Sequence, residues 1–295
     1  VSFALLLFSA LGYFFPAFGA GNNLLSIVCA SVFLWFLTAL VLRGVKEAAG
    51  INTIVTLAKL VPLGLFVLSI VLLGKFNVDI FMDNFWGEPA GPGFGEQVVS
   101  TMIALVWVFT GIEGAVVISG RAKYVRDVGR STALGFAAVF TLYLIISMLS
   151  LGIMPREEMA QLATPSMAGI LECAIGPVGA AIVNLGVILS LVGALLGYVI
   201  IASETPFEAA RQGSFPLAFA KTNKHDAPVV TVLVSSGITQ LFLIVSYVAA
   251  STYQFFYSCA VNTILVPYVC SAAYYMVIGW KNEHLDGPHA PSVGK

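Results

Sequence analysis

The chain has 295 residues, of which 59% are hydrophobic and only 10% are charged. Soluble domains carry about 25% charged residues, so a chain with a mean hydropathy of +0.95 is expected to be an integral membrane protein. The net charge of −1 offers no basic field for nucleic acid, which excludes a nucleic-acid-binding role from the expected functions.

Eight apolar segments follow one another along the chain. They are Val1–Pro16, Leu24–Leu42, Ile51–Leu73, Val98–Gly120, Thr132–Met154, Val178–Ala202, Val229–Ala249 and Phe255–Gly279. Most are long enough for a helix to cross a hydrocarbon core of roughly 30 Å, and they lack the alternating pattern of barrel strands. We therefore predict an all-α polytopic membrane protein. The first segment is short and begins at Val1, so we expect a truncated fragment with about eight transmembrane helices.

The basic residues of the connecting segments predict the orientation. Eleven of the fourteen Lys and Arg residues follow the second, fourth, sixth and eighth apolar segments, whereas Lys75 and Arg156 lie on the opposite side. Basic residues favour the cytoplasmic side of a membrane. The sequence thus predicts a multi-pass protein in contact with the lipid bilayer, with a cytoplasmic tail from Trp280 onward.

Two connecting segments are predicted to have structure of their own. Pro155–Pro177, on the outer side, contains a stretch that fits a short amphipathic helix. Glu204–Pro228 is expected to extend the sixth helix inward and then to turn at Gly213 and Pro216. We expect no soluble domain, and a single transmembrane domain is taken to cover residues 1–295.

One acidic residue, Glu113, lies inside the fourth segment, in the stretch "WVFTGIEGAV". A mid-membrane carboxylate costs about 2.5–3.5 kcal/mol on insertion scales, and each glycine beside it weakens a helix by about 1 kcal/mol. The stretch therefore favours a broken helix, in which the carbonyls of Trp107 to Thr110 meet a ligand ammonium and Glu113 acts as a gate or charge partner. The alternative is an intact helix in which Gly111 and Gly114 serve a close helix contact.

A basic residue, Lys59, lies inside the third segment, roughly 12 Å from its cytoplasmic end at 1.5 Å per residue. Burial lowers the pKa of a lysine, so Lys59 could carry a proton or replace a bound cation. A lysine at this depth could also extend its amine to the cytoplasmic interface. The sequence leaves both interpretations open.

Three further polar residues are candidates with competing interpretations. Tyr198 could form an aromatic wall against a cationic side chain, or pack beside Gly193 and Gly197. Asn262 and Ser258 could contact a ligand, or form hydrogen bonds between helices. The three histidines are scattered and predict no metal site, and no catalytic or nucleotide-binding motif is present in context. We therefore expect neither an enzyme nor a cofactor.

Several stretches together resemble the amino acid–polyamine–organocation superfamily. They are "LLLFSALGYFFPAFG", "LVLRGVKEAAGINTIVTLAKLVP", "VWVFTGIEGAVVISGRAKYVRDVGRSTALGF" and "SLVGALLGYVIIASETPFEAARQGSFP". Within that superfamily the chain resembles the basic amino acid/polyamine antiporters, and most of all the bacterial arginine/ornithine antiporters. The resemblance covers nearly the whole chain. It implies a leucine-transporter-like inverted-repeat fold of twelve helices, of which this chain would hold helices 3 to 10.

The resemblance also implies roles for single residues. Trp107 and Thr110 match positions of the broken sixth helix whose carbonyls meet the substrate ammonium, with Val108 and Gly111 beside them, and Trp107 and Glu113 match the gate. Tyr198 stands where these antiporters often have a tryptophan that stacks on the guanidinium. Lys59 resembles a lysine of proton-coupled relatives. Asn262 is assigned as the polar residue of the tenth helix.

The function implied is secondary active transport of a cationic amino acid, with exchange of arginine for ornithine as the leading hypothesis. Proton-coupled symport through Lys59 and a membrane sensor or subunit that binds without transport are the alternatives. The expected partners are a small cationic amino acid and the lipid bilayer, and a homodimer is left open.

Overall fold

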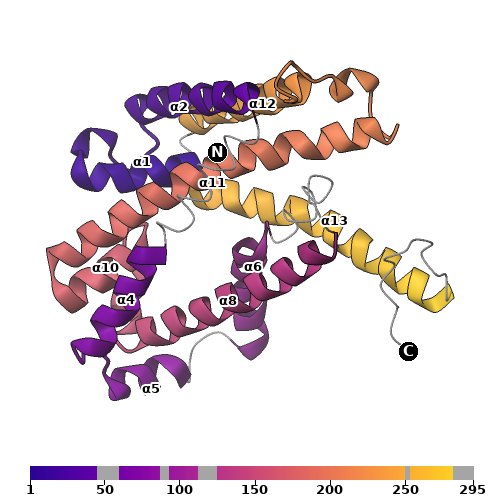
Figure 1. Ribbon diagram of the computed structural model, residues 1–295. Helices are drawn as coiled ribbons and strands as arrows, with labels where there is room; N and C mark the ends of the chain where they lie inside the picture. The colour runs from indigo at the N-terminus through magenta and orange to yellow at the C-terminus, as the bar shows by residue number, and fades with distance from the viewer. Residues whose placement is uncertain (45–59, 87–92, 112–124, 250–252, 282–295) are drawn as a thin grey trace. The chain divides into compact units, whose positions relative to one another are not determined.

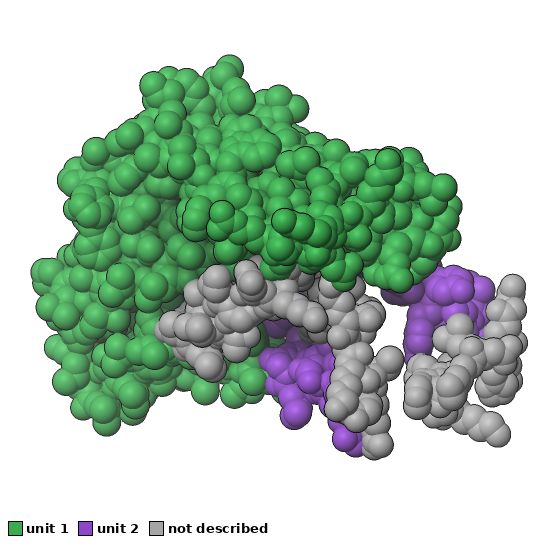
Figure 2. Space-filling view, turned by 45° about the horizontal axis from the view of Figure 1, so that its top comes forward, with its two compact units in different colours: residues 1–91, 137–253 green, residues 92–136, 254–295 purple. Residues whose placement is uncertain are grey.

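The computed structural model describes residues 1–44, 60–86, 93–111, 125–249 and 253–281. The regular structure in these residues is helical, apart from an isolated bridge between Thr222 and Pro228. The chain forms two compact units, shown in different colours in Figure 2. Unit 1 comprises Val1–Gly91 and Ala137–Tyr253, and unit 2 comprises Pro92–Phe136 and Gln254–Lys295.

The helices follow the apolar segments of the sequence (Figure 1). In chain order they are α1 (Ser2–Phe14), η1 (Pro16–Phe18), α2 (Leu24–Arg43), α4 (Leu60–Leu72), α5 (Val78–Trp86), α6 (Phe94–Phe109), α8 (Val125–Leu151), α9 (Arg156–Ala160), α10 (Ser166–Ile175), α11 (Pro177–Arg211), η3 (Leu217–Ala220), α12 (Val229–Val248) and α13 (Tyr253–Lys281).

Five of the described helices are long and apolar enough to cross a membrane. They comprise Leu24–Arg43, Asp127–Leu151, Pro177–Arg211, Val229–Val248 and Phe255–Ile278. The predicted segments near residues 1–16, 51–73 and 98–120 appear as the shorter apolar helices α1, α4 and α6, and the last two of these border residues that are not described. The predicted all-α membrane architecture is confirmed.

The long helix α11 is the element against which most of unit 1 packs (Figure 1). It contacts α1, α2, α4, α10 and α12. At Gly186 the absence of a side chain is required, because a Cβ there would overlap the ring of Pro62 on α4. Small residues allow such close approach between membrane helices, where packing rather than water drives association.

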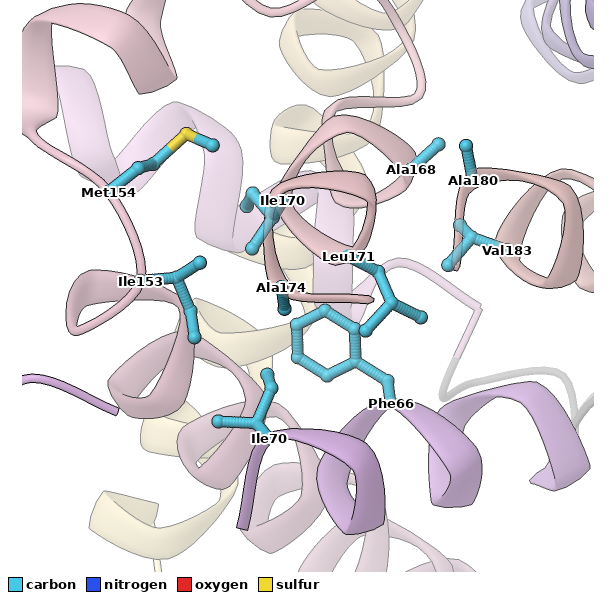
Figure 3. Close-up of a cluster of buried hydrophobic side chains, with 10 residues drawn as sticks. All are labelled: Phe66, Ile70, Ile153, Met154, Ala168, Ile170, Leu171, Ala174, Ala180 and Val183. Atoms are coloured by element: carbon cyan, nitrogen blue, oxygen red, sulfur yellow. The ribbon is translucent and has the colours of Figure 1, made fainter. Parts of the chain in front are cut away.

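One core of unit 1 lies between α4, α10 and α11 (Figure 3). The ring of Phe66 points from α4 towards Leu171 and Ala174 of α10, and all three side chains are buried. The other buried members are Ile70, Ile153, Met154, Ala168, Ile170, Ala180 and Val183. Because the cluster includes residues that follow α8, it joins the end of that helix to α10 and α11.

A second core joins α2, α11 and α12. Leu37 and Val41 of α2 pack with Leu196 and Ile200 of α11 and with Val232 of α12. These residues recur at spacings of four on α2 and on α11, so each helix presents one stripe to the others. This cluster holds the three helices together.

The two predictions about connecting segments are also confirmed as to secondary structure. The segment Pro155–Pro177 contains the short helix α10. The sixth predicted helix continues to Arg211, and the chain then turns at Gly213, which has a φ of 78°, and at Pro216, which precedes η3. Glycine is the residue that adopts such a positive φ without steric strain.

Candidate functional site

Helix α6 ends in the stretch where the sequence predicts an interrupted helix. Phe109 is its last residue, and Thr110 has an extended backbone with φ −62° and ψ 131°. Gly111 then has a φ of 105°, which residues with a Cβ rarely adopt. The chain therefore leaves the helical path at Thr110 and Gly111. Glu113, the predicted gate, lies outside the described residues.

The carbonyl groups at this helix end are partly engaged. The Thr110 N–H donates to the carbonyl of Val106 at 3.0 Å and to that of Trp107 at 3.2 Å, and the Thr110 hydroxyl donates to Val106 at 2.7 Å. The sequence interpretation treated the carbonyls of this stretch as open. Because a carbonyl oxygen has two lone pairs, a ligand amine would share the Trp107 oxygen with Thr110.

The side chain of Trp107 lies against an aromatic ring of α13. The ring centroids of Trp107 and Tyr257 are 5.7 Å apart at an angle of 51°, within the range of favourable aromatic pairs. Two residues farther along α6, the ring of Phe109 lies 5.3 Å from that of Phe136 of α8. Sequence reasoning missed Tyr257, since a tyrosine in an apolar helix gives no local indication of its partner.

Two polar candidates of α13, Asn262 and Ser258, lie on a helix of unit 2. Asn262 is exposed and Ser258 is half-buried, and neither side chain forms a hydrogen bond with a described residue. The helix–helix hydrogen bonds that were one interpretation of these residues are thus not seen among the described residues. Val108 of α6 is likewise exposed, with 41% of its surface accessible.

Tyr198 is half-exposed on α11, with 36% of its surface accessible. Its ring rests against Phe3 of α1, with centroids 5.2 Å apart and planes inclined by 59°. Gly193 is buried and Gly197 is half-buried on the same helix. One side of the ring therefore packs on Phe3, while the accessible part can contact another group.

The predicted site residues belong to different units. Trp107, Val108, Thr110 and Gly111 lie together at the end of α6 in unit 2, which also contains Asn262, whereas Tyr198 belongs to unit 1. Lys59 lies outside the described residues. Among those residues, no group of three or more His, Cys, Asp or Glu side chains is arranged to hold a metal ion.

Comparison with known proteins adds a family match that covers almost the whole sequence. Residues 1–294 match the amino acid permease family. The chain is 42% identical over 292 residues to an arginine/ornithine antiporter of Pseudomonas aeruginosa, a match that covers 96% of this chain and 60% of that relative.

Two other relatives have related names. An arginine/ornithine antiporter of Latilactobacillus sakei is 37% identical over 95% of the chain and 59% of its own length. An arginine/agmatine antiporter of Chlamydia pneumoniae is 36% identical over 93% of the chain and 58% of its own length. The chain thus spans about three fifths of the length of the curated relatives that it matches.

Proposed function

Because the chain belongs to the amino acid permease family, we propose that the protein exchanges cationic amino acids across a bacterial cytoplasmic membrane, most simply arginine for ornithine. The names of the relatives support this substrate class, since two are arginine/ornithine antiporters and one is an arginine/agmatine antiporter. The helices long enough to span a membrane agree with such a role. We assign no enzymatic activity and no cofactor to the chain.

The observation that carries the proposal is that α6 ends at Phe109, inside a longer apolar segment of the sequence. The carboxyl end of a helix carries a partial negative charge, equivalent to about half an elementary charge. A substrate ammonium is attracted to such an end, and carbonyl groups there can accept its hydrogen bonds. We therefore place the α-amino group at the backbone of Trp107, Val108, Thr110 and Gly111.

The side chains of Trp107 and Glu113 are proposed to control access to this position. The ring of Trp107 already contacts Tyr257, so a change in that pair would move one wall of the site. Glu113 follows two residues after Gly111 and would supply a negative charge to a cationic substrate. Asn262, on α13 with Tyr257, is proposed as a further polar contact.

Tyr198 is proposed to contact the cationic side chain of the substrate. A cation over an aromatic face gains about 0.5–2 kcal/mol, depending on how completely water is excluded. The contact with Phe3 restrains one part of the Tyr198 ring, and the accessible part is the surface that a guanidinium would use. Tryptophan binds cations better than tyrosine, so the tyrosine lowers this contribution without removing it.

The exchange proposal has a direct test in liposomes that contain the purified full-length protein. Labelled arginine is added outside, with or without ornithine inside, at equal pH on both sides. Exchange of two solutes of equal charge moves no net charge, so we expect uptake to require internal ornithine and to be insensitive to membrane potential.

Two results would contradict the proposal, and each favours one alternative. Uptake that proceeds without internal ornithine and follows an imposed proton gradient would indicate symport. Saturable arginine binding without any flux would indicate a sensor or subunit.

A Glu113→Gln variant should reduce exchange more than it reduces the amount of protein in the membrane.

A further inference from the structure

The turn between η3 and α12 is held against the end of α2 by one asparagine. The Asn223 side chain donates from Nδ2 to the carbonyl of Leu42 at 2.7 Å, while its Oδ1 accepts from the N–H groups of His225 and Ala227 at 2.9 and 3.1 Å. The Asn223 N–H donates to the Ala227 carbonyl at 3.0 Å. Asn223 therefore fixes the shape of the turn and its position on α2.

This connection brings basic residues from distant parts of the sequence together. Arg43 follows Leu42 directly at the end of α2, and Lys224 and His225 follow Asn223 in the turn. Lys221 lies at the start of the turn, where its carbonyl accepts from the Val229 N–H at 3.3 Å. All four side chains are exposed, so they form a basic cluster, defined here as Arg43, Lys221, Lys224 and His225.

The charges of the basic cluster are not neutralised by the described carboxylates. Arg43, Lys221 and Lys224 form no ion pair with a described residue, whereas Arg211 nearby in sequence is paired with Glu208 at 3.0 Å. Asp226 is the one acidic residue in the turn, and the carboxyl end of α2 adds a partial negative charge. Three permanent cations outweigh these two contributions.

The basic cluster lies where an exposed apolar stripe reaches the end of a membrane-spanning helix. Val32 and Phe36 of α2 are 67% and 61% accessible, and Ala39 and Arg43 continue the same face at spacings of three and four residues. Helix α12, which packs against α2, starts immediately after the turn (Figure 1). A surface of this kind is complementary to an anionic phospholipid. The apolar stripe can contact its acyl chains, and the cations can contact its phosphate.

We infer that the basic cluster binds the headgroup of an anionic membrane phospholipid, whose acyl chain lies along Val32 and Phe36. The Asn223 contacts fix the backbone that carries the cations, so little ordering of the turn opposes the association. Basic residues at a membrane surface each contribute about a fivefold gain in affinity for anionic lipid. A neutral lipid with a phosphocholine headgroup would gain much less.

The test measures lipid binding to the full-length protein in detergent by titration with phosphatidylglycerol, phosphatidylcholine or inorganic phosphate. The readouts are the amount of lipid retained and the shift in melting temperature. The double variant Arg43→Gln with Lys224→Gln should lose about 25-fold in affinity for phosphatidylglycerol and keep its weak response to phosphatidylcholine. The control variant Lys75→Gln with Arg156→Gln removes the same charge from other exposed positions and should bind like the unaltered protein.

Equal binding of the two lipids by the unaltered protein would overturn the inference, and so would equal losses in the two double variants. Protection by inorganic phosphate as strong as that by phosphatidylglycerol would show a site for a soluble anion instead of a lipid. The unaltered melting temperature of each variant in phosphatidylcholine checks that it is folded. Because lipid binding is measured without any amino acid, the result does not depend on the proposed exchange.

Discussion

The rings of Trp107 and Tyr198 each lie against another aromatic ring, and the two residues differ in how much surface stays accessible. Trp107 is half-buried and pairs with Tyr257, whereas Tyr198 rests on Phe3 and keeps 36% of its surface exposed. A ring that is held at one side and accessible at the other is suited to stack on a ligand without large losses of side-chain entropy. This favours Tyr198 as the residue that meets the substrate side chain.

Replacing Tyr198 tests that role. Tyr198→Ala should weaken arginine binding by about 0.5–2 kcal/mol because a cation–aromatic contact is lost, and Tyr198→Trp should retain affinity. Calorimetric titration of the full-length protein with arginine measures the effect. The control is Tyr247→Ala, which removes an exposed ring from α12. Unchanged affinity in Tyr198→Ala would show that this ring is not part of the substrate site.

At the scale of the elements, α2 and α12 are joined by polar side chains inside an apolar interface. Thr38 and Ser236 are buried, and their hydroxyl oxygens are 2.8 Å apart. The Thr38 hydroxyl also lies 2.8 Å from the Leu34 carbonyl, which can only accept. Since a hydroxyl has one proton, we infer that Thr38 donates to Leu34 and that Ser236 donates to Thr38.

Farther along the same interface, a second polar contact links the two helices. The Trp35 Nε1–H donates to Gln240 Oε1 at 3.2 Å, and Gln240 Nε2 donates to the Ser31 hydroxyl at 2.9 Å. Hydrogen bonds of this kind fix the register of helices whose apolar surfaces would otherwise slide. Polar contacts at two positions along the interface therefore fix how α2 and α12 pack together.

A double-mutant cycle of Thr38→Val and Ser236→Ala should give a coupling energy of about 0.6 kcal/mol, and at most about 1.7 kcal/mol. The reason is that each single change removes the same interhelical hydrogen bond, so the second change costs less than the first. The measurement is the free energy of unfolding of the full-length protein in a detergent that supports refolding. Strictly additive effects would contradict the proposed hydrogen bond.

Another contact at this scale secures the end of α8. Asn84 of α5 donates from Nδ2 to the carbonyls of Leu151 and Met154 at 2.6 and 2.9 Å, and its Oδ1 accepts from the Arg156 N–H at 2.9 Å. The carbonyls at a helix end lack partners within the helix, so this side chain supplies what the backbone cannot. It thereby joins α5, α8 and α9 in unit 1.

At the scale of the whole molecule, the chain is a multi-pass membrane protein of the amino acid permease family. It spans about three fifths of the relatives' length, so the activity of the whole protein is tested in its full-length form. The expected single transporter domain over residues 1–295 and the expected cytoplasmic tail stay predictions.

Replacing Lys59 distinguishes arginine/ornithine exchange from proton-coupled symport. Under exchange, Lys59→Ala should leave arginine/ornithine counterflow within about twofold of the unaltered rate, because no proton is moved with the solutes. Under symport the same variant should abolish uptake driven by a pH gradient. Both fluxes are measured in the same liposomes. Loss of counterflow in a folded variant that still binds arginine would contradict the expectation that exchange does not require Lys59.

The sequence by itself determined the class of the protein, most of its helices and the end of α6 beside Thr110 and Gly111. These features are local: a long apolar run is stable as a helix in lipid, and Gly111 permits a backbone angle that ends one. Each stretch that carries the family resemblance is continuous in the sequence, so the resemblance could be recognised without knowledge of the fold.

Only the tertiary structure decided which side chains meet. Thr38 and Ser236 are 198 positions apart, and Asn223 is 181 positions from Leu42. In a water-soluble helix, the apolar stripe shows which face turns inward. In a membrane helix, lipid is as apolar as the protein core, so no such stripe indicates the rotation of the helix. The partners of Trp107, Tyr198 and Asn223 therefore follow from packing, which the pattern of residues along the chain does not record.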